Sequence, residues 1–387
     1  MLRIDICHIY ACTSGSAGTY MHAIYDALKE TFSQECIVSH YYPYSYGKHW
    51  FYRYSELCSS YRFIKRHDFI RKIIRFLELV LALFRSFIFI VVNRVKIINY
   101  SLNSDLFIEY YFLKAVKNIT KTKIAITCHD VLPFGVDVNN IEKTNAFKKK
   151  KHFFDLADFL IVHNKNSVIE LNIYFKIDNT KIYTMPFPVM DIRMFLRENS
   201  LPTNISRCIK NHFIISMVGH FRKEKGLDIL LDAWGEVFKK LSDAYLIIMG
   251  HFPNKDSLKQ YSNLKNVIIY DGFLNDNAYA EIIHESDVVV LPYRRGTNSG
   301  IPSSIISMGT MILASNIEMF RNNQIISKDL LFNTENASSL ANKLVWIYSL
   351  SKDEREHIIE NNLFLLKKYI SSFKYDTIST YNLMFEK

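Results

Sequence analysis

Residues 212–226 read HFIISMVGHFRKEKG, and the fold can be argued outward from this stretch. Its first half is an apolar run rich in β-forming residues, which is typical of a strand buried inside a parallel sheet. Its second half is a loop that carries Arg222 and Lys225 and ends in Gly226, where a pattern of helical period begins. The stretch therefore predicts a strand, a cationic loop and a helix in succession.

The same alternation continues on both sides of this stretch. Downstream, AYLIIMG, NVIIYDG, DVVVLPY and TMILAS predict further strands, with helices near residues 277–285 and from Gly300. Upstream, RIDICHIYA, VKIINYSL, KIAITCHDV and DFLIVHN predict the strands of an earlier domain. Strands that alternate with helices indicate mostly parallel sheets, so we predict an α/β protein made of two doubly wound domains.

The domain boundaries follow from the places where periodicity is lost. At about 150 residues per domain, 387 residues accommodate two or three domains. The βα pattern of the first domain runs to about Pro188, and residues 189–211 gain turn formers, which is typical of an interdomain link. We place the boundary near residue 200 and predict domains at 1–200 and 201–370. Residues 371–387 are predicted to be a helix that crosses back to the first domain.

Composition excludes several classes of protein. A chain with 49% hydrophobic and 22% charged residues is ordinary for a globular protein, so collagenous, disordered and disulfide-scaffold classes are excluded. Its six cysteines include no Cys-x-x-Cys pair, which fits a reducing compartment. The first residues lack the basic region and the long apolar run of a signal peptide. We therefore expect a cytoplasmic protein.

The net charge of +10 is concentrated in residues 48–98, which hold eleven Lys or Arg residues against three acidic ones. This segment also contains the most apolar run of the chain, LVLALFRSFIFIVVN at residues 79–93. Glu78 and Arg85 interrupt the apolar pattern, which argues against a membrane-spanning helix of about 20 apolar residues.

Two interpretations of this segment stay open. In one, basic residues attract acidic headgroups while an apolar face embeds, so the segment makes peripheral contact with an anionic membrane. In the other, it forms a buried helix and strand with a solvated basic rim. Nucleic acid is not an expected partner, because the chain shows no helix-turn-helix, zinc-finger or RNA-stacking motif.

Two loops of the second domain carry candidate ligand-binding residues. Ligands of doubly wound sheets bind beyond the carboxyl ends of the strands, where helix N-termini offer backbone N–H groups. Arg222 and Lys225 could clamp a diphosphate, Arg222 through forked N–H donors and Lys225 as a point charge. In the loop after DVVVLPY, Gly300 lets the backbone approach a phosphate. Taken singly, either loop is weak evidence for a binding site, and a pair of solvated cations explains it better.

Together, the order and spacing of these segments resemble the family 4 retaining glycosyltransferases of the GT-B fold. The matching segments are GHFRKEKG (219–226), YLIIMG (245–250), DGFL (271–274), SDVVVLPY (286–293) and SGIPSSIISMG (299–309), followed by TMILAS. The resemblance implies two Rossmann-like domains that face each other across a cleft. It also implies transfer of a sugar from a nucleotide-diphosphate donor, UDP- or GDP-linked, to a glycan or polyprenyl-linked acceptor. The expected setting is cell-envelope polysaccharide synthesis, of lipopolysaccharide O-antigen, capsule or exopolysaccharide.

The resemblance also assigns roles to residues. The implied catalytic residues are His129, Arg222 and Lys225. The implied donor-binding residues are Gly15, Ser16, Gly18, Gly272, Phe273, Thr297, Asn298, Ser299, Gly300, Ile301 and Ser304. The two cations would neutralise the pyrophosphate as negative charge grows on the leaving phosphate, and His129 would lie beside the donor sugar. As a single histidine after a strand, His129 is also compatible with a loop residue whose hydrogen bonds are satisfied.

One departure from the family pattern bears on the function. Many members carry two glutamates eight positions apart, and Gly296 and Ser304 stand at those positions here. Thr297, Asn298 and Ser304 are the nearest polar residues that could replace them. The loss leaves open a non-catalytic GT-B protein that binds a glycan or a partner, or another sugar-nucleotide enzyme such as an epimerase. No Asp-x-Asp, H-x-x-x-H or H-E-x-x-H spacing occurs, so we predict neither a metal nor a cofactor besides the donor.

Overall fold

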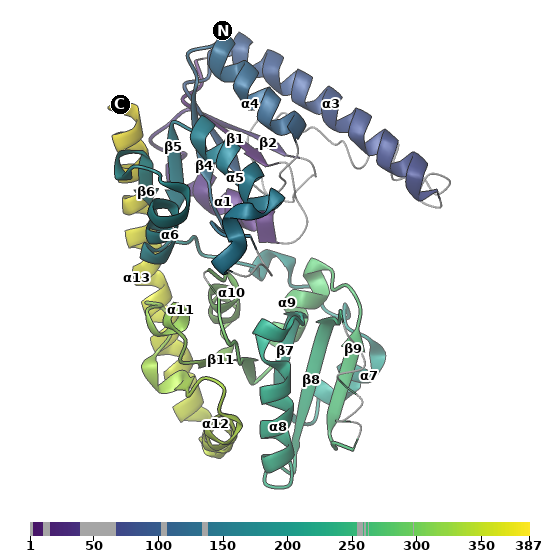
Figure 1. The fold of residues 1–387 in the computed structure, drawn as a ribbon. Coiled ribbons are helices and arrows are strands. Elements are labelled where there is room, and N and C mark those ends of the chain that lie inside the picture. Colours follow the sequence, from purple (N-terminus) through teal and green to yellow (C-terminus); the bar gives the residue numbers. More distant parts are fainter. Residues whose placement is uncertain are drawn as a thin grey trace. The chain divides into compact units, whose positions relative to one another are not determined.

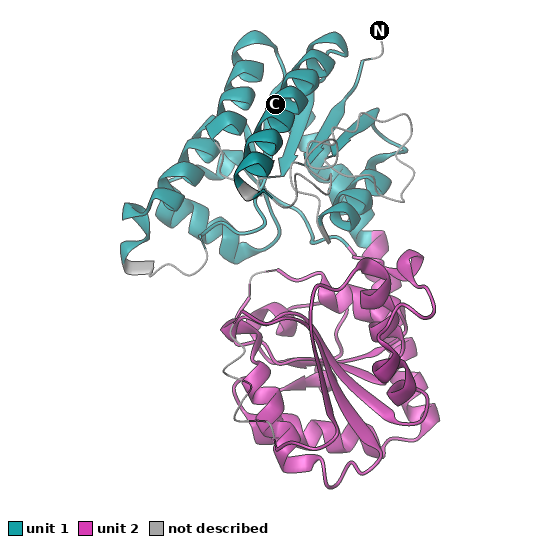
Figure 2. Cartoon of the chain, turned by 90° about the vertical axis from the view of Figure 1, so that its right-hand side faces the viewer, with its two compact units in different colours: residues 1–188, 372–387 teal, residues 189–371 magenta. Residues whose placement is uncertain are grey.

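A computed structural model of the chain describes residues 3–10, 16–38, 67–101, 107–133, 138–253, 258, 261, 263–296 and 298–387. The chain forms two compact units, shown in different colours in Figure 2. Unit 1 comprises residues 1–188 and 372–387, and unit 2 comprises residues 189–371.

Unit 1 contains a six-stranded sheet in the order β2-β1-β3-β4-β5-β6, in which every pair is parallel (Figure 1). Its strands are β1 (Ile6–Tyr10), β2 (Gln34–Val38), β3 (Ile97–Ser101), β4 (Lys123–Thr127), β5 (Phe159–Val162) and β6 (Ile182–Thr184). Its helices are α1 (Ser16–Leu28), α3 (Asp68–Val92), α4 (Phe107–Ile119), α5 (Asn145–Leu156) and α6 (Lys165–Phe175).

Unit 2 contains a second parallel sheet of six strands, in the order β12-β11-β10-β7-β8-β9. Its strands are β7 (Phe213–His220), β8 (Ala244–His251), β9 (Val267–Asp271), β10 (Val288–Leu291), β11 (Met311–Ser315) and β12 (Leu331–Phe332). Its helices are α7 (Thr203–Ile209), α8 (Leu227–Val237), α9 (Asp276–His284), α10 (Ile301–Ser307), α11 (Glu318–Arg321) and α12 (Ala337–Ser349). The long helix α13 (Lys352–Phe385) contributes residues 352–371 to unit 2 and 372–385 to unit 1.

The apolar strands of unit 2 explain where its core lies. The first six residues of β7 are all buried, as are all four of β10, because these strands have neighbours on both sides and helices over both faces. Helix α8 supplies the largest core side chain, Trp234, whose indole Nε1 donates a hydrogen bond to the Lys265 carbonyl at 2.9 Å. The apolar periodicity that predicted this helix from Gly226 therefore marks its buried face.

The two units divide about a dozen residues before the domain boundary that we predicted near residue 200. It falls between Pro188 and Val189 because Val189 and Ile192 are buried in the core of unit 2. The predicted link also contains a short helix, α7, whose Ile205 is fully buried. Seven residues are too few for a helical period to stand out in sequence.

Residues 79–92 belong to the helix α3, which matches neither open interpretation completely. One face of α3 is buried in unit 1 through residues such as Leu79, Leu83 and Ile90. The opposite face carries exposed apolar side chains, among them Leu77 and Phe84. In the described residues, no helix combines the length and the hydropathy needed to cross a bilayer. Residues 48–66 of the basic segment lie outside the described residues.

Candidate functional site

The order of the second sheet brings the two candidate loops together. The chain builds β8 and β9 on one side of β7 and β10, β11 and β12 on the other, so the direction of strand addition reverses between β7 and β10. Doubly wound sheets bind ligands beyond the carboxyl ends of the strands at such a switch point. The loop after β7 carries Arg222 and Lys225, and the loop after β10 carries Ser299 and Gly300.

Ion pairs join these two loops. Arg294 makes a bidentate pair with Asp228 of α8, with N–O distances of 2.8 and 2.7 Å. Its backbone N–H donates to the Glu224 carbonyl at 2.8 Å, and Arg295 pairs with the Glu224 carboxylate at 2.7 Å. The carboxylates of Asp228 and Glu224 thus balance two cations of the second loop.

Lys225 is held against Tyr293. Its Nζ lies 3.7 Å from the centroid of the Tyr293 ring, and this buried ring belongs to the second residue after β10. Burial, with a smaller contribution from the positive charge of Arg222, lowers the pKa of Lys225 to about 8. Burial raises the pKa of the Tyr293 hydroxyl, while Ser299 and Arg222 lower it in part. Lys225 therefore reaches from the loop after β7 to an aromatic ring of the loop after β10.

Gly226 permits the close approach of the two loops. It adopts a φ of 67°, and a Cβ at this position would lie 1.9 Å from the carbonyl oxygen of Pro292. A side chain would therefore collide with the backbone that leads into the second loop. Gly300 directly precedes α10, and a Cβ there would lie 2.4 Å from Cγ of the Met190 side chain.

The two positions at which many family members carry glutamates, Gly296 and Ser304, differ in their burial. Ser304 is buried, and its hydroxyl donates to the Met190 carbonyl at 2.9 Å. With its proton used in this bond, the Ser304 hydroxyl could replace a carboxylate only as an acceptor. Gly296 is exposed, and a Cβ there would approach only the end of the Met319 side chain, at 3.1 Å.

The remaining predicted donor residues of unit 2 lie in short loops. Gly272 follows β9 and donates its N–H to the Gly250 carbonyl at 3.0 Å. The side chain of Phe273 is 83% exposed, so a ligand could contact it without a rearrangement of the loop. Ile301 is the first residue of α10, and Asn298 is partly buried just before it. Thr297 lies outside the described residues.

In unit 1, His129 lies at the carboxyl edge of the sheet, two residues after β4. Its Nε2 is within hydrogen-bonding distance of the Tyr10 hydroxyl, at 3.1 Å, and the Ser101 hydroxyl, at 3.0 Å. Those two residues end β1 and β3, the strands between which the order of this sheet reverses. His129 thus occupies the corresponding switch point of unit 1.

A second histidine supports this arrangement. His163 donates from Nδ1 to the Met185 carbonyl, at 3.0 Å, so its Nε2 accepts from the Tyr20 hydroxyl, at 2.9 Å. The Tyr20 ring packs edge-on against His129, with 4.6 Å between ring centroids. Burial, assisted by the charges of His163 and Lys150, lowers the pKa of His129 to about 3. His129 is therefore neutral at physiological pH.

The predicted glycine loop of unit 1 is described only in part. Gly15 lies outside the described residues, and of Ser16 only the backbone is described, as the first residue of α1. Gly18 is buried in the first turn of α1. Nothing in the described part of the chain gathers three or more His, Cys, Asp or Glu side chains into a group that could hold a metal ion.

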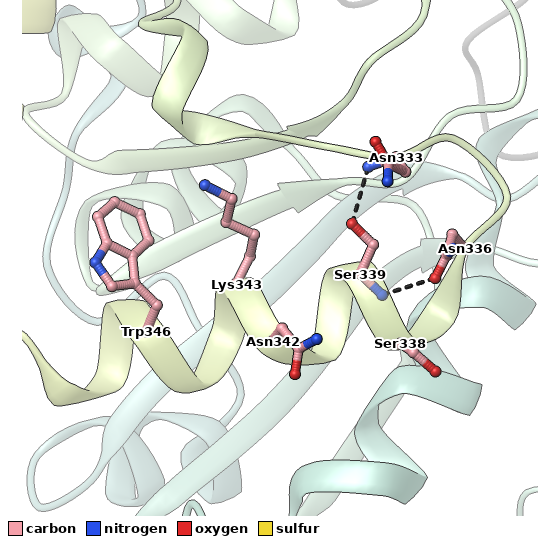
Figure 3. Close-up of a pocket in the computed structure, with 7 residues that line it drawn as sticks. All are labelled: Asn333, Asn336, Ser338, Ser339, Asn342, Lys343 and Trp346. Carbon is pink, nitrogen blue, oxygen red and sulfur yellow. Dashed lines mark hydrogen bonds between the residues drawn. The ribbon is translucent and has the colours of Figure 1, made fainter.

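An open polar hollow on α12 contains none of the predicted site residues (Figure 3). Its lining residues are Asn333, Asn336, Ser338, Ser339, Asn342, Lys343 and Trp346. Much of its hydrogen-bonding capacity is used locally, because Asn336 caps α12 through the Ser339 N–H, at 2.7 Å. Lys343 likewise donates to the Asp329 carbonyl at 2.6 Å. The hollow therefore adds nothing to the site at the strand ends.

Sequence reasoning missed three supporting residues of these sites, Tyr293, Tyr20 and His163. Tyr293 stands inside the quoted segment SDVVVLPY, and its place just beyond the apolar strand was a signal that pointed to the ligand-binding edge. Tyr20 and His163 are separated by 143 residues, so no local pattern connects them.

Comparison with known proteins places residues 212–349 in a match to the family model "Glycosyl transferases group 1". Over 98 residues the chain is 30% identical to the phosphatidyl-myo-inositol mannosyltransferases of Mycobacterium tuberculosis and Mycobacterium bovis. That alignment covers 25% of this chain and 26% of the relatives, so the match spans about a quarter of their length.

Solved structures resemble the chain over nearly its whole length. Sucrose-phosphate synthase from Thermosynechococcus elongatus aligns with a TM-score of 0.68 at 14% identity, covering 99% of this chain and 100% of that one. HepE from Anabaena, in complex with UDP and glucose, aligns with a TM-score of 0.63 at 13% identity, covering 96% and 98%. The likeness shows that the chain has the two-domain α/β fold of these proteins, the GT-B fold.

Proposed function

We propose that the chain is a metal-independent, retaining glycosyltransferase that moves a sugar from a nucleotide-diphosphate donor, UDP- or GDP-linked, to a glycan or polyprenyl-linked acceptor. The observation that carries the proposal is the position of Arg222 and Lys225 in the loop after β7, at the switch point of unit 2, with Lys225 against the ring of Tyr293. The match of residues 212–349 to a glycosyltransferase family supports it, as does a structural neighbour that holds UDP and glucose.

The chemistry of sugar transfer explains why two cations would stand there. The bond between the anomeric carbon and the terminal phosphate oxygen breaks, and its electron pair stays on the leaving diphosphate. Arg222 would bind the phosphate oxygens through forked N–H donors, while Lys225 would contribute a charge from a half-buried position. Preorganised charges that face growing negative charge are a major source of catalysis.

Retention of configuration would follow from attack on the same face that the diphosphate leaves. The departing phosphate would take the proton of the attacking hydroxyl, so no enzyme nucleophile is needed. His129 enters the proposal as a neutral hydrogen-bonding group for a substrate sugar, because burial keeps its imidazole uncharged. Trapping of a covalent sugar on a side chain would contradict this mechanism.

The proposed setting is bacterial cell-envelope polysaccharide synthesis, of lipopolysaccharide O-antigen, capsule or exopolysaccharide. We place the protein in the cytoplasm, with peripheral contact to the inner membrane face through residues 48–98. The concentration of positive charge in that segment supports this contact, since anionic headgroups attract Lys and Arg.

A test of donor binding uses thermal unfolding with UDP, GDP and dTDP, first for the wild type and then for the double variant Arg222→Ala/Lys225→Ala. We expect one nucleotide to raise the unfolding midpoint of the wild type and to lose its effect on the double variant. Lys223→Ala serves as the control, because it removes an exposed cation from the same loop and should keep the effect. An unchanged shift in the double variant would place the donor elsewhere.

A second experiment separates catalysis from binding. Incubation with labelled UDP-, GDP- and dTDP-sugars should give transfer to an added glycan or slow hydrolysis of one donor. The missing glutamates at Gly296 and Ser304 favour the competing function of a non-catalytic GT-B protein. Nucleotide binding with neither hydrolysis nor transfer would support that competing function, and epimerised donor without transfer would indicate an epimerase.

A further inference from the structure

The outer face of α3 is the largest concentration of exposed apolar side chains in the described part of the chain. Of the 22 large apolar side chains that are exposed there, eleven belong to this one helix. They are Phe69, Ile70, Ile73, Phe76, Leu77, Val80, Leu81, Phe84, Ile88, Val91 and Val92. A contiguous exposed patch of this kind marks a surface that contacts something other than water.

The spacing of these residues shows that they form one continuous face. Steps of three and four residues from Phe69 through Leu77 and Phe84 to Ile88 keep them on one side of the helix. Leu79, Leu83 and Ile90 follow the same steps on the opposite side, where they are buried in unit 1. Helix α3 has 25 residues, so the outer face is about 37 Å long.

The neighbouring helix α4 also carries exposed aromatic residues. Helix α4 packs beside α3 (Figure 1), and its Phe107 and Tyr111 are both exposed. Their rings are 6.1 Å apart between centroids. Aromatic side chains of this kind, Tyr in particular, favour the boundary between water and lipid.

The charges along α3 indicate what contacts the outer face. Lys72, Arg75 and Arg85 are exposed along the helix, whereas Glu78 is buried. A second copy of the chain would bring an identical set of cations to the contact, and like charges would repel. Anionic lipid headgroups, in contrast, complement these cations while acyl chains accept the apolar side chains.

We infer that the outer face of α3 lies flat in the headgroup and upper acyl region of an anionic lipid bilayer. The inference deepens the proposed function and depends on it only for its purpose, which is to bring the protein to a polyprenyl-linked acceptor. Contact along one face requires no helix that crosses the membrane, so it agrees with the hydropathy of the described helices.

Vesicle co-sedimentation of the full chain tests the inference, with phosphatidylcholine vesicles and with vesicles that also contain 30% phosphatidylglycerol, where the percentage is roughly that of an anionic membrane. We expect binding to the anionic vesicles that weakens at high salt. The variant Leu77→Gln/Leu81→Gln should lower the partition coefficient by about tenfold or more, because two embedded side chains become polar. The matched control is Ile169→Gln/Ile173→Gln on α6, where two equally exposed residues have the same spacing. This control should bind as the wild type does.

The electrostatic part of the inference has its own pair of variants. Lys72→Gln/Arg75→Gln should weaken binding to the anionic vesicles, whereas Lys148→Gln/Lys149→Gln on α5 removes the same charge from another exposed helix and should change it less. Circular dichroism establishes that each variant is folded. The nucleotide-induced shift of the unfolding midpoint, measured without lipid, should be unchanged in the α3 variants. Failure of donor binding is thereby distinguished from failure of membrane contact.

Three results would overturn the inference. In the first, the wild-type chain stays in the supernatant with anionic vesicles at low salt. In the second, the α3 variants sediment as the wild type does. In the third, Leu77→Gln/Leu81→Gln dissociates a dimer while vesicle binding is absent, because the outer face would then belong to a contact between two copies.

Discussion

The ammonium group of Lys225, which we propose binds the diphosphate, has a charge that depends on the fold around it. Burial and the neighbouring Arg222 lower its pKa from 10.5 to about 8. In the unfolded chain the lysine would keep its proton up to higher pH, so between about pH 8 and 10.5 the unfolded state binds more protons. The contribution of Lys225 to the free energy of unfolding therefore rises with pH across that window. Its capacity to bind a diphosphate falls across the same window.

The affinity for the nucleoside diphosphate should accordingly fall between pH 7 and 9. One pH unit above its pKa, about a tenth of Lys225 is charged, so the wild type should lose up to about tenfold in affinity. Lys225→Arg keeps its charge at both pH values and should lose less. Calorimetric titration at the two pH values measures these affinities. Any change caused by titration of the nucleotide itself affects both proteins, so the Arg variant serves as the control for it. Equal losses in both proteins would mean that Lys225 does not contact the diphosphate.

Restoring the missing carboxylates should affect stability strongly at one position and weakly at the other. Ser304 is 4% exposed and donates to the Met190 carbonyl, so Ser304→Glu buries a charge and should lower the free energy of unfolding by about 3 kcal/mol or more. Gly296→Glu places its side chain at an exposed position and should change the free energy by less than about 1 kcal/mol. Denaturant unfolding of both variants checks this prediction. A stable Ser304→Glu protein would show that the loop around α10 can rearrange.

The short connections between strands and helices also restrict which residues can occupy them. The turn from β7 into α8 depends on Gly226, whose φ is positive and whose Cα lies against the Pro292 carbonyl. Gly226→Ala should cost about 2 kcal/mol or more through backbone strain and the collision. Gly235→Ala is the control, since Gly235 is exposed inside α8 and a Cβ there makes only an ordinary contact of 3.6 Å with Leu264. It should stabilise the protein by about 0.5 kcal/mol. Thermal unfolding that ranks the two variants the other way would contradict this account of the turn.

Element types were predictable from sequence because strands and helices have different periods. The apolar runs that became β7, β8 and β10 are buried on both faces, and such runs are recognisable without knowledge of their neighbours. The helix α7 was missed because it is short, and the nature of α3 stayed open because both its faces are apolar. For α3, the sequence contains two apolar stripes, and only packing against unit 1 decides which one is buried.

The end of α13 connects the last residues of the chain to the first domain. Residues 372–387 are counted with unit 1, where Tyr381 is fully buried and Phe385 stacks on Phe32 with 5.1 Å between ring centroids. Lys387 donates to the Thr180 carbonyl at 2.6 Å. The stability of unit 1 therefore depends on residues that follow the whole of unit 2 in sequence.

Tyr381→Ala should destabilise the protein by about 3 to 5 kcal/mol, because it leaves a cavity in unit 1. Tyr375→Ala on the same helix removes the same side chain from a position that is 74% exposed, and should change the free energy of unfolding by less than about 0.5 kcal/mol. Denaturant unfolding of the two variants measures the difference. If both variants were equally stable, the C-terminal helix would not be part of the core of unit 1.

The sequence alone determined the fold class and the segments that carry the candidate chemistry, because helical and strand periods and turn residues are local properties. It also located Arg222, Lys225 and His129 just after predicted strands, which places them at ligand-binding edges. The tertiary structure decided which side chains meet there. The ring of Tyr293 under Lys225, the pair of Arg294 with Asp228 and the contact of Tyr20 with His163 all join residues from different elements. Such contacts depend on strand order, which a one-dimensional pattern does not contain.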